Sequence, residues 1–560
     1  MNNPRQFFFK PISGFGLLLG ALCFAASLTP SLIPRTYVIQ GALSGMAIGA
    51  GYGIGVILQS IWRYLELPGL PAAMRRTVHV LLTLLCGALV VISLYHAKAW
   101  QNSVRAVLDM EPVETGYPFS VSWIAVLTFL VLLVIARLLL SFGWLMAKGF
   151  YRRFPKRVSV VLGVALASVL VVTLTNGVLI KYTFRILDRS FQQYDALLEP
   201  DRPQPVIAER AGSINSKLDW RELGRAGREF VSSGPTASDI MAFTQRPALE
   251  PIRMYAGLQV AETPEERSRI LLEELIRVKA FDRQALVIIT PTGTGWVDPA
   301  AMDGLEYLLD GNVASVALQY SYLNSPMSLL FQPESGMESA QALFRTIHDY
   351  WKELPAQTRP KLYLHGLSLG AFNSQRSFNF FEILGDPIQG GVWSGPPFPS
   401  EMWRTLTNNR QVGTPEWLPI YEDGRFVRFM NQDGTYKGQP QQPWGDVRFV
   451  YLQYASDAIT FFERSLLYRE ADWMKQPRGP DVSPLLEWYP VVSMLQVLVD
   501  MPLSDTVPLG YGHVYSPDHY LNAWLEVTGV DSWDLEKIAA LKSLLLQRSR
   551  SGDGYEYRGG

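Results

Sequence analysis

A serine between two glycines stands in "KLYLHGLSLG", residues 361–370, and forms the pattern G-x-S-x-G around Ser368. The pattern is short enough to arise by chance, so its surroundings decide its meaning. The residues before it, "KLYLH", predict a buried strand, and "GAFNSQRSFNFFEIL" after it predicts a helix. A strand, a sharp turn and a helix lift a serine hydroxyl above a sheet, as a nucleophile elbow requires. Ser368 is therefore the candidate nucleophile.

A serine is a weak nucleophile unless a neighbouring base takes its proton. Four histidines follow residue 180: His348, His365, His513 and His519. His348 falls within a predicted helix, and His365 falls at a strand end where local packing is expected. Elbow serines are followed along the chain by the acid and then the histidine. This order favours "PLGYGHVYSPDHYLNAW", and within it His513, in a loop, over His519, which could cap or pack the next helix.

The acidic partner should follow a strand that lies between these two positions. Asp457 comes a few residues after the predicted strand in "RFVYLQYAS". It would hold one tautomer of the histidine and stabilise the imidazolium. A role as the N-cap of the next helix is the alternative, and Asp500 and Asp505 are weaker rivals.

Two backbone amides are expected to form an oxyanion hole. The first is the amide of Leu369, directly after the candidate nucleophile. The second should lie in "LVIITPTGTGWVDP", where Pro291 has no N–H, so the Thr292 or Gly293 amide is favoured, with Thr292 as the first choice. The same loop lacks the Lys-Ser/Thr of a phosphate-binding P-loop and the third glycine of a dinucleotide site, so nucleotide binding is not expected.

The elements that position these residues alternate along residues 251–560. Predicted strands are "IRMYAGL", "ALVIIT", "VASVALQY", "KLYLH", "GGVWSG" and "RFVYLQYAS". Predicted helices include "TPEERSRILLEELIRVKAF", with Thr263 as its N-cap, "MDGLEYLL" and "MESAQALFRTIHDYWKEL". Short apolar strands separated by helices predict an α/β fold with a mostly parallel sheet covered by helices on both faces.

The first third of the chain has a different character. Of the 560 residues 48% are hydrophobic and only 18% are charged, and the long apolar runs end near residue 180. A helix needs about 20 apolar residues to cross a bilayer. Five segments approach this length and predict an all-α, five-helix transmembrane domain: residues 13–33, 38–58, 79–95, 121–145 and 158–180.

Basic residues in the short loops predict the orientation of these spans. Ten lie before the first span or in the loops after the second and fourth, and three lie in the other loops: Arg35, Lys98 and Arg105. Because Lys and Arg accumulate on the cytoplasmic side, the N-terminus is expected inside. An odd number of spans then places the rest of the chain outside the cytoplasmic membrane.

Two further segments of this region have specific expectations. Gly41, Gly45, Gly49 and Gly53 share one face of the second span, which favours close helix packing within one bundle over a dimerisation face. Residues 181–250 read as a juxtamembrane connector. Within it "DWRELGRAGREFV" predicts an amphipathic helix that either lies on lipid headgroups or packs on the following domain.

The overall composition excludes several classes of function. The net charge of −1 gives no indication of a nucleic-acid partner. The two cysteines, Cys23 and Cys86, both fall in apolar runs, so no disulfide framework, zinc site or thiol nucleophile is expected. No cofactor and no metal are predicted.

Seven motifs, taken in order along the chain, resemble a bacterial membrane-bound α/β-hydrolase family with a multi-span N-terminal domain. They are "SLTPSLIPR", "LGRAGREFV", "TPTGTGWVDP", "QYSYLNS", "RPKLYLHGLSLGAF", "GPPFPSEMW" and "GHVY". The resemblance implies an α/β-hydrolase fold in which Ser368, Asp457 and His513 match the nucleophile, acid and base. Leu367 stands where the family often has Glu, which alters local polarity but not the nucleophile.

These observations together predict a membrane-anchored serine hydrolase that cleaves an ester through an acyl-enzyme. Its expected division is a transmembrane domain in residues 1–180, a connector in 181–250 and a catalytic domain in 251–560. Apolar insertions near residues 403–444 and 468–508, above all "SPLLEWYPVVSMLQVLVDMP", suggest either a lid or acyl-chain wall for a lipid or other apolar ester, or a simple cover for the core. Membrane lipids and an ester are the expected partners. The alternatives are an acyltransferase with the same triad and a non-enzymatic envelope scaffold or transport accessory.

Overall fold

The computed structural model describes residues 11–69, 71–147, 190–199, 202–439 and 441–551, with scattered positions between 150 and 173. The chain folds into two compact units. The first contains Met1–Arg185 and Phe462–Leu503, and the second contains Ile186–Phe461 and Ser504–Gly560. This division differs from the one expected from the sequence, because residues 462–503 group with the N-terminal helices and residues 186–250 group with the sheet that follows them.

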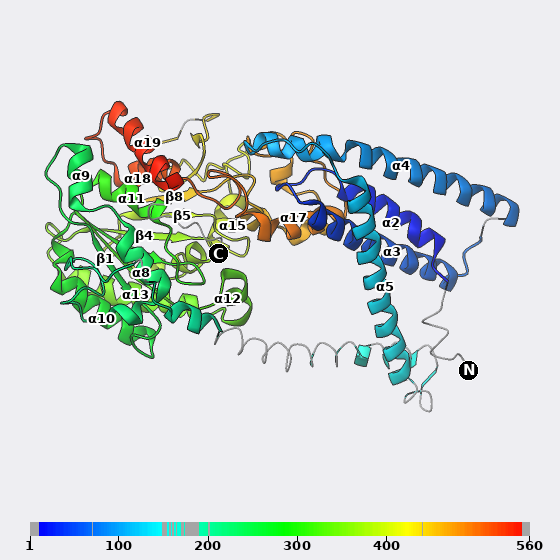
Figure 1. The fold of residues 1–560 in the computed structure, drawn as a ribbon, viewed down its shortest axis with the longest axis horizontal. Coiled ribbons are helices and arrows are strands. Elements are labelled where there is room, and N and C mark those ends of the chain that lie inside the picture. The colour runs from blue at the N-terminus through cyan, green and yellow to red at the C-terminus, as the bar shows by residue number, and fades with distance from the viewer. Residues whose placement is uncertain are drawn as a thin grey trace. The chain divides into compact units, whose positions relative to one another are not determined.

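In its described part, the N-terminal portion of the first unit has four apolar helices (Figure 1): α2 (Gly14–Ser27), α3 (Tyr37–Tyr64), α4 (Ala72–Val107) and α5 (Pro118–Ala147). Among the described residues, three helical segments are long and apolar enough to cross a membrane: Tyr37–Tyr64, Met74–Val107 and Pro118–Ala147. They coincide with the second, third and fourth predicted spans. The helix in the first predicted span has only 14 residues, and the fifth span lies almost wholly outside the described part of the chain.

Glycines allow α3 to approach its neighbours closely. A Cβ atom at Gly41 would lie 2.6 Å from the Cβ of Ile124 in α5, and one at Gly45 would lie 2.5 Å from the Cβ of Thr128. A Cβ at Gly53 would meet open space. The prediction that these glycines pack helices within one bundle is confirmed for Gly41 and Gly45.

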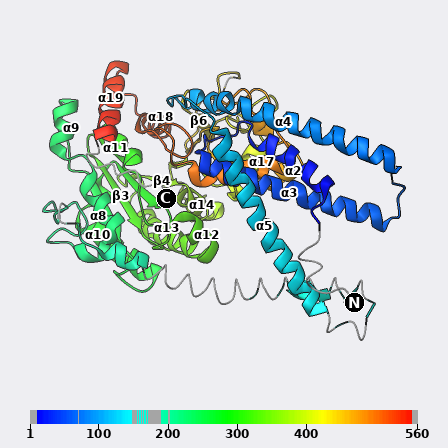
Figure 2. The ribbon, with the colours of Figure 1, turned by 45° about the vertical axis from the view of Figure 1, so that its right-hand side comes forward.

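The segment Phe462–Leu503 carries α17 (Val492–Asp500), which packs against α2 and α3 within the first unit (Figure 2). Asp500, at the end of α17, pairs with Arg35 at 2.8 Å, and both side chains are fully buried. Asp500 also accepts the Leu32 N–H at 3.1 Å and a short hydrogen bond from the Ser31 hydroxyl. Of the two expectations for residues 483–502, the structure supports a cover: this apolar segment packs on the ends of two helices.

The second unit contains an eight-stranded sheet with the order β1-β3-β2-β4-β5-β8-β6-β7. Every neighbouring pair is parallel except β6 and β7. The strands are β1 (Ile252–Ala256), β2 (Ala285–Thr290), β3 (Val313–Leu318), β4 (Lys361–Leu367), β5 (Gly390–Ser394), β6 (Val427–Asn431), β7 (Gly434–Thr435) and β8 (Arg448–Leu452). The first five and β8 match predicted strands, whereas β6 and β7 lie in the first apolar insertion and were not predicted.

Helices cover both faces of this sheet (Figures 1 and 2). On one side α10 (Pro264–Arg277) packs against α13 (Ser335–Glu353), and on the other α11 (Pro299–Leu308), α18 (Pro517–Thr528) and α19 (Leu535–Ser551) pack together. Because both faces are covered, β1, β2 and β3 are buried along their whole length. The remaining helices are α8 (Gly224–Ser233), α9 (Ala237–Thr244), α12 (Ser325–Phe331), α14 (Leu369–Ser374), α15 (Glu401–Asn408) and α16 (Ala458–Phe461).

The connector helix packs on the sheet. A Cβ atom at Gly227 of α8 would lie 2.3 Å from the ring of Tyr255 in β1, and Phe230 of the same helix is buried against that ring. Of the two expectations for "DWRELGRAGREFV", the structure therefore supports a helix packed on the following domain.

Candidate active site

Ser368 occupies a strained turn between β4 and α14. Its φ of 56° and ψ of −125° lie in a region that residues with a Cβ rarely adopt. The two flanking glycines make this turn possible. A Cβ atom at Gly366 would lie 2.5 Å from the carbonyl carbon of Gly370, and one at Gly370 would lie 2.2 Å from the Thr290 carbonyl oxygen. This is the geometry of a nucleophile elbow.

The elbow is held at the carboxyl end of the sheet. The Ser368 N–H donates to the Ser394 carbonyl at 2.9 Å, which ties the turn to the end of β5. The Ser368 side chain is nearly buried, with 8% of the residue exposed. Backbone strain at an isolated residue persists only where its surroundings determine it, and such residues cluster at functional sites.

Asp457 and His513 lie in direct contact. His513 Nδ1 is 2.7 Å from Asp457 Oδ2, and Asp457 is fully buried. The Tyr515 hydroxyl donates to the same carboxylate oxygen at 2.8 Å. The other oxygen, Oδ1, accepts the Ile459 N–H at 2.9 Å and the Thr460 N–H at 3.3 Å. The carboxylate is therefore fixed by several donors, and it fixes the orientation of the imidazole in turn.

The imidazole of His513 lies at the same sheet edge as the elbow. Gly395 directly follows β5 with a φ of +48°, and a Cβ atom there would lie 2.6 Å from His513 Cε1. Ser394, the residue before it, pairs with Leu367, the residue before the candidate nucleophile. The structure thus brings Ser368, His513 and Asp457 to the carboxyl ends of three neighbouring strands, β4, β5 and β8.

The other histidines have separate partners. His519 Nδ1 lies 2.6 Å from the Tyr454 hydroxyl, and burial lowers the pKa of His519. His365 Nδ1 lies 2.8 Å from the Val392 carbonyl, and burial lowers the pKa of His365 to about 4. His348 Nε2 lies 3.2 Å from the Asp386 carbonyl. These contacts give all three rings a place in the packing of the domain.

The rival acids differ in position. Asp500 belongs to the first unit and is paired with Arg35. Asp505 lies near His513. Burial raises the pKa of Asp505, and the interaction with His513 offsets a smaller part of this increase. Among these carboxylates, the structure gives a hydrogen bond to the His513 ring only for Asp457.

Leu369, the first expected oxyanion amide, begins α14 directly after Ser368. The candidates for the second amide lie in the turn after β2. The Thr292 N–H donates to the Trp296 carbonyl at 3.0 Å, so this first choice is already engaged. The Gly293 N–H, the second choice, donates to the Ser325 hydroxyl at 3.2 Å. The Ser325 hydroxyl can rotate away and free the Gly293 N–H, whereas the Trp296 carbonyl is fixed in the backbone of the turn. Gly293 is therefore the better candidate of the two. The turn adjoins the elbow, because Gly370 packs against Thr290 and Pro291.

Sequence reasoning missed two residues of this site. Tyr515, which donates to Asp457, stands in "GHVY", and Gly395, which makes room for the imidazole, stands in "GPPFPSEMW". Both motifs contribute to the family resemblance. The sequence therefore indicated that these two segments matter, but not what Tyr515 and Gly395 do. Within the described residues no group of three or more His, Cys, Asp or Glu side chains is arranged to hold a metal ion.

Comparison with known protein families agrees with this architecture. Residues 252–541 match the model of an alpha/beta-hydrolase family, and residues 28–235 match the model of the N-terminal region of an alpha/beta-hydrolase family. The chain belongs to this alpha/beta-hydrolase family, and membership indicates a hydrolase. No curated protein and no solved structure gives a significant match.

Proposed function

We propose that this protein is a serine hydrolase that cleaves an ester through an acyl-enzyme, with Ser368 as nucleophile, His513 as base and Asp457 as its acidic partner. The observation that carries the proposal is the Asp457–His513 contact at the sheet edge where Ser368 sits on its strained elbow.

The contacts of His513 define how protons would move. With Nδ1 held by Asp457, Nε2 is the ring atom that takes the Ser368 proton as the hydroxyl attacks the ester carbonyl. The imidazolium then gives this proton to the departing alcohol. Water, activated by the same histidine, attacks the acyl-enzyme and releases the acid. Burial raises the pKa of Tyr515 well above its usual value, so its hydroxyl stays a donor to Asp457.

Charge on the tetrahedral intermediate needs two amide donors. We assign one to Leu369 and the other to Gly293, which would exchange its Ser325 partner for the oxyanion. Each donor is worth about 3 kcal/mol in the transition state.

The hydrolysis of p-nitrophenyl esters by the detergent-solubilised full chain tests this function. Ser368→Ala and His513→Ala should each lower kcat by a factor of about 10³ or more, while His519→Asn, which changes a histidine bonded to Tyr454, should retain most activity. Full activity in Ser368→Ala would remove the basis of the proposal. Product that forms only when an alcohol acceptor is added would favour the acyltransferase alternative, and a folded but inactive protein would favour the scaffold.

We also propose that the N-terminal unit crosses the cytoplasmic membrane and that the hydrolase unit lies outside the cytoplasm. The docked segment Phe462–Leu503 supports this side. It contacts the loop between α2 and α3 through the Arg35–Asp500 pair, and Ser483 within it lies 2.8 Å from Ser103 near the end of α4. The segment thus contacts the start of α3 and the end of α4. These ends lie opposite the α3–α4 connection, near which Arg63, Arg75 and Arg76 are found. Because the segment joins the hydrolase unit at both of its ends, these contacts support the same side for the hydrolase unit as the basic loops do.

A further inference from the structure

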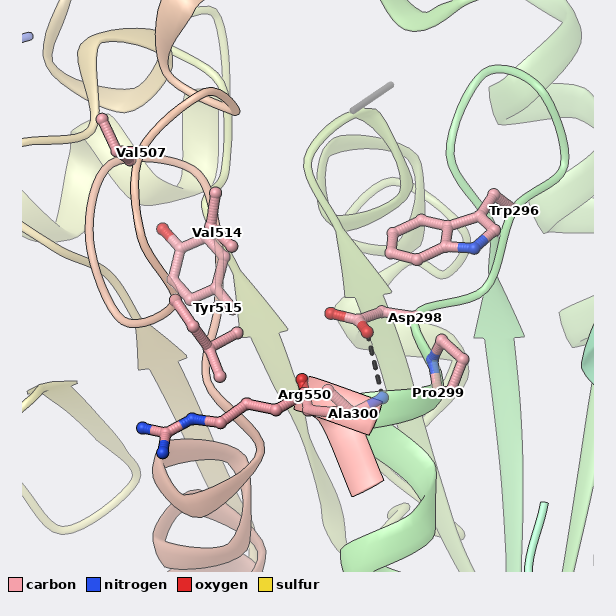
Figure 3. Close-up of a pocket in the computed structure, with 10 residues that line it drawn as sticks. Trp296, Asp298, Pro299, Ala300, Val507, Val514, Tyr515 and Arg550 are labelled. Carbon is pink, nitrogen blue, oxygen red and sulfur yellow. Dashed lines mark hydrogen bonds between the residues drawn. The ribbon is translucent and has the colours of Figure 1, made fainter. Parts of the chain in front are cut away.

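A cavity of about 250 Å³ opens in the second unit (Figure 3). Its walls are mainly apolar and include Trp296, Val507, Leu509, Val514 and Tyr515. Ligand pockets for drug-sized molecules run to roughly 300–1,000 Å³, so this cavity suits a short group.

One charged side chain interrupts the apolar wall. Asp298 is only 4% exposed, and its Oδ1 accepts the Ala300 N–H at 3.0 Å, which caps α11. Its Oδ2 is buried without a hydrogen-bond partner among the described residues. Figure 3 shows the carboxyl group of Asp298 directed toward the side of the cavity formed by Val514 and Tyr515.

Capping does not explain this second oxygen. An N-cap needs one acceptor, which Ser or Thr supplies without a charge. A buried carboxylate oxygen that makes no hydrogen bond costs stability. Burial raises the pKa of Asp298, and the nearby Tyr520 hydroxyl offsets only part of this increase. That hydroxyl lies 2.7 Å from Ser394 Oγ, and Asp298 Oδ2 has no partner in hydrogen-bonding geometry among the described residues. The unsatisfied oxygen therefore indicates an acceptor that is kept for something entering the cavity.

The cavity adjoins the proposed active site on two sides. Trp296 and Asp298 follow the turn that contains Gly293, and Val514 and Tyr515 directly follow His513. Tyr515 is shared, since it lines the cavity and donates to Asp457. A molecule bound at Ser368 can thus extend into this space.

We propose that the cavity binds a short, mainly apolar part of the ester substrate that carries a hydroxyl group, and that this hydroxyl donates to Asp298 Oδ2. This inference rests on the proposed hydrolase function and names its substrate class. A hydroxyl is favoured over an ammonium group, because Arg550 also lines the cavity and would repel a second cation.

Two sets of substrates test the proposal and locate the hydroxyl. In the first, p-nitrophenyl hexanoate is compared with p-nitrophenyl hexanoates that carry a hydroxyl at successive carbons. In the second, butyl butanoate is compared with its hydroxybutyl counterparts. In one set, at least one hydroxylated ester should show kcat/KM about 10-fold or more above the parent, because a site built to bind a hydroxyl rejects the analogue that lacks it.

Asp298→Ser is the matched variant, since serine keeps the cap of α11 and removes the oxygen that faces the cavity. It should abolish the hydroxyl preference, so that hydroxylated and parent esters give kcat/KM values within about twofold of each other. Val507→Phe, which fills the cavity, should lower kcat/KM for the preferred hydroxylated ester more than for p-nitrophenyl acetate.

The outcomes separate this inference from the function on which it rests. If the wild-type protein hydrolyses the parent esters but prefers no hydroxylated ester in either set, the cavity assignment is wrong and the hydrolase proposal stands. A preference that persists in Asp298→Ser also overturns the assignment. If nothing is hydrolysed and a fluorophosphonate leaves Ser368 unlabelled, the proposed function fails and the substrate class fails with it.

Discussion

Ser368 is positioned by its backbone conformation, whereas Asp457 is positioned by hydrogen bonds to its side chain. A residue held in a sparsely populated backbone region costs about 1–3 kcal/mol, and the hydrogen bond from the Ser368 N–H to Ser394 helps to hold the turn in place. Asp457 instead depends on its donors, which keep a fully buried carboxylate in one orientation beside His513. The proposal therefore makes separate predictions for the two residues.

Asp457→Asn keeps the size of the side chain but presents the histidine with the wrong hydrogen-bonding group. We expect kcat to fall by about 10⁴ with little change in KM, because the imidazole would be held in an unproductive tautomer. Asp505→Asn is the control, since Asp505 lies near His513 whereas His513 Nδ1 is bonded to Asp457. Steady-state kinetics on one ester gives both values, and a variant of Asp457 with more than a tenth of wild-type kcat would contradict the assignment.

Asp298 should also produce a pH dependence of stability. Burial raises the pKa of Asp298 from 3.8 to about 7. Between these values the folded protein holds a proton that the unfolded chain has lost, so the stability contributed by this group is lost as pH rises from 3.8 to 7. Relative to wild type, the unfolding free energy of Asp298→Ser should increase across this window by roughly 4 kcal/mol at most.

Denaturant unfolding of both proteins in the same detergent, at several pH values from 4 to 8, measures this difference. The buried His365 contributes a pH dependence of the opposite sign, but it is present in both proteins and cancels in the comparison. A difference between the two proteins that is constant over the whole range would show that Asp298 does not titrate as expected.

Among the helices and strands, the main difference from expectation is the packing of the second apolar insertion, which contains α17, on α2 and α3. The sequence shows that residues 483–502 are apolar and must be covered, but a lid and a cover for helix ends satisfy this equally. The deciding contacts are a few polar contacts between residues far apart in the sequence. Asp500 contacts Arg35 and Ser31, which lie over 460 residues earlier in the chain. A pattern read along the sequence does not reveal such a pairing.

The strands around the elbow could be predicted, because each is a short apolar run bounded by turn residues. The strands β6 and β7 could not, since β6 is only partly buried and β7 has two residues. The candidate site shows the same contrast. The types and order of Ser368, Asp457 and His513 make them candidates from the sequence. The hydrogen bond from the Thr292 amide to the Trp296 carbonyl, in contrast, depends on the folded turn.

The Arg35–Asp500 pair should be essential for docking α17. Because both side chains are fully buried, removing one partner leaves an uncompensated charge, and Asp500→Leu should cost about 3–5 kcal/mol of unfolding free energy. The double variant Arg35→Met/Asp500→Leu should recover a large part of this loss. Thermal unfolding in detergent compares the three proteins, and equal transition temperatures for all of them would contradict the described contact.

The glycines of α3 provide a matched pair of substitutions. Gly45→Ala would place a Cβ atom 2.6 Å from the Ala125 carbonyl oxygen and should separate α3 from α5, whereas Gly53→Ala adds its Cβ in open space. We expect a lower transition temperature for Gly45→Ala and no decrease for Gly53→Ala. Because Ala favours a helix more than Gly does, propensity alone would raise the transition temperature of both variants. A similar decrease in both variants, or no decrease in Gly45→Ala, would contradict the packing role of Gly45.

For the whole molecule, the chain path connects the two proposed roles. The hydrolase unit leaves its own sheet after Phe461, passes through the helical unit and returns at Ser504, between its candidate acid and its candidate base. The His513 N–H donates to the Ser504 carbonyl at 2.7 Å, so the base loop is held by the first residue after the return. We therefore expect the hydrolase unit on the side of the membrane that carries the α2–α3 loop.

A reporter fused after residue 560 tests this sidedness. Alkaline phosphatase, which is active only outside the cytoplasm, should be active in the fusion, and a fluorescent protein that requires the cytoplasm should be dark. The opposite pair of results would place the hydrolase unit inside and would contradict the orientation drawn from the basic loops.

The most direct test of the central claim is covalent capture of the nucleophile. The purified full chain is treated with a fluorophosphonate, and the modified peptide is identified by mass spectrometry. We expect one phosphonylated residue, Ser368, with labelling lost in Ser368→Ala and strongly slowed in His513→Ala. Folded protein that stays unlabelled, or that is labelled at a different serine, would contradict it.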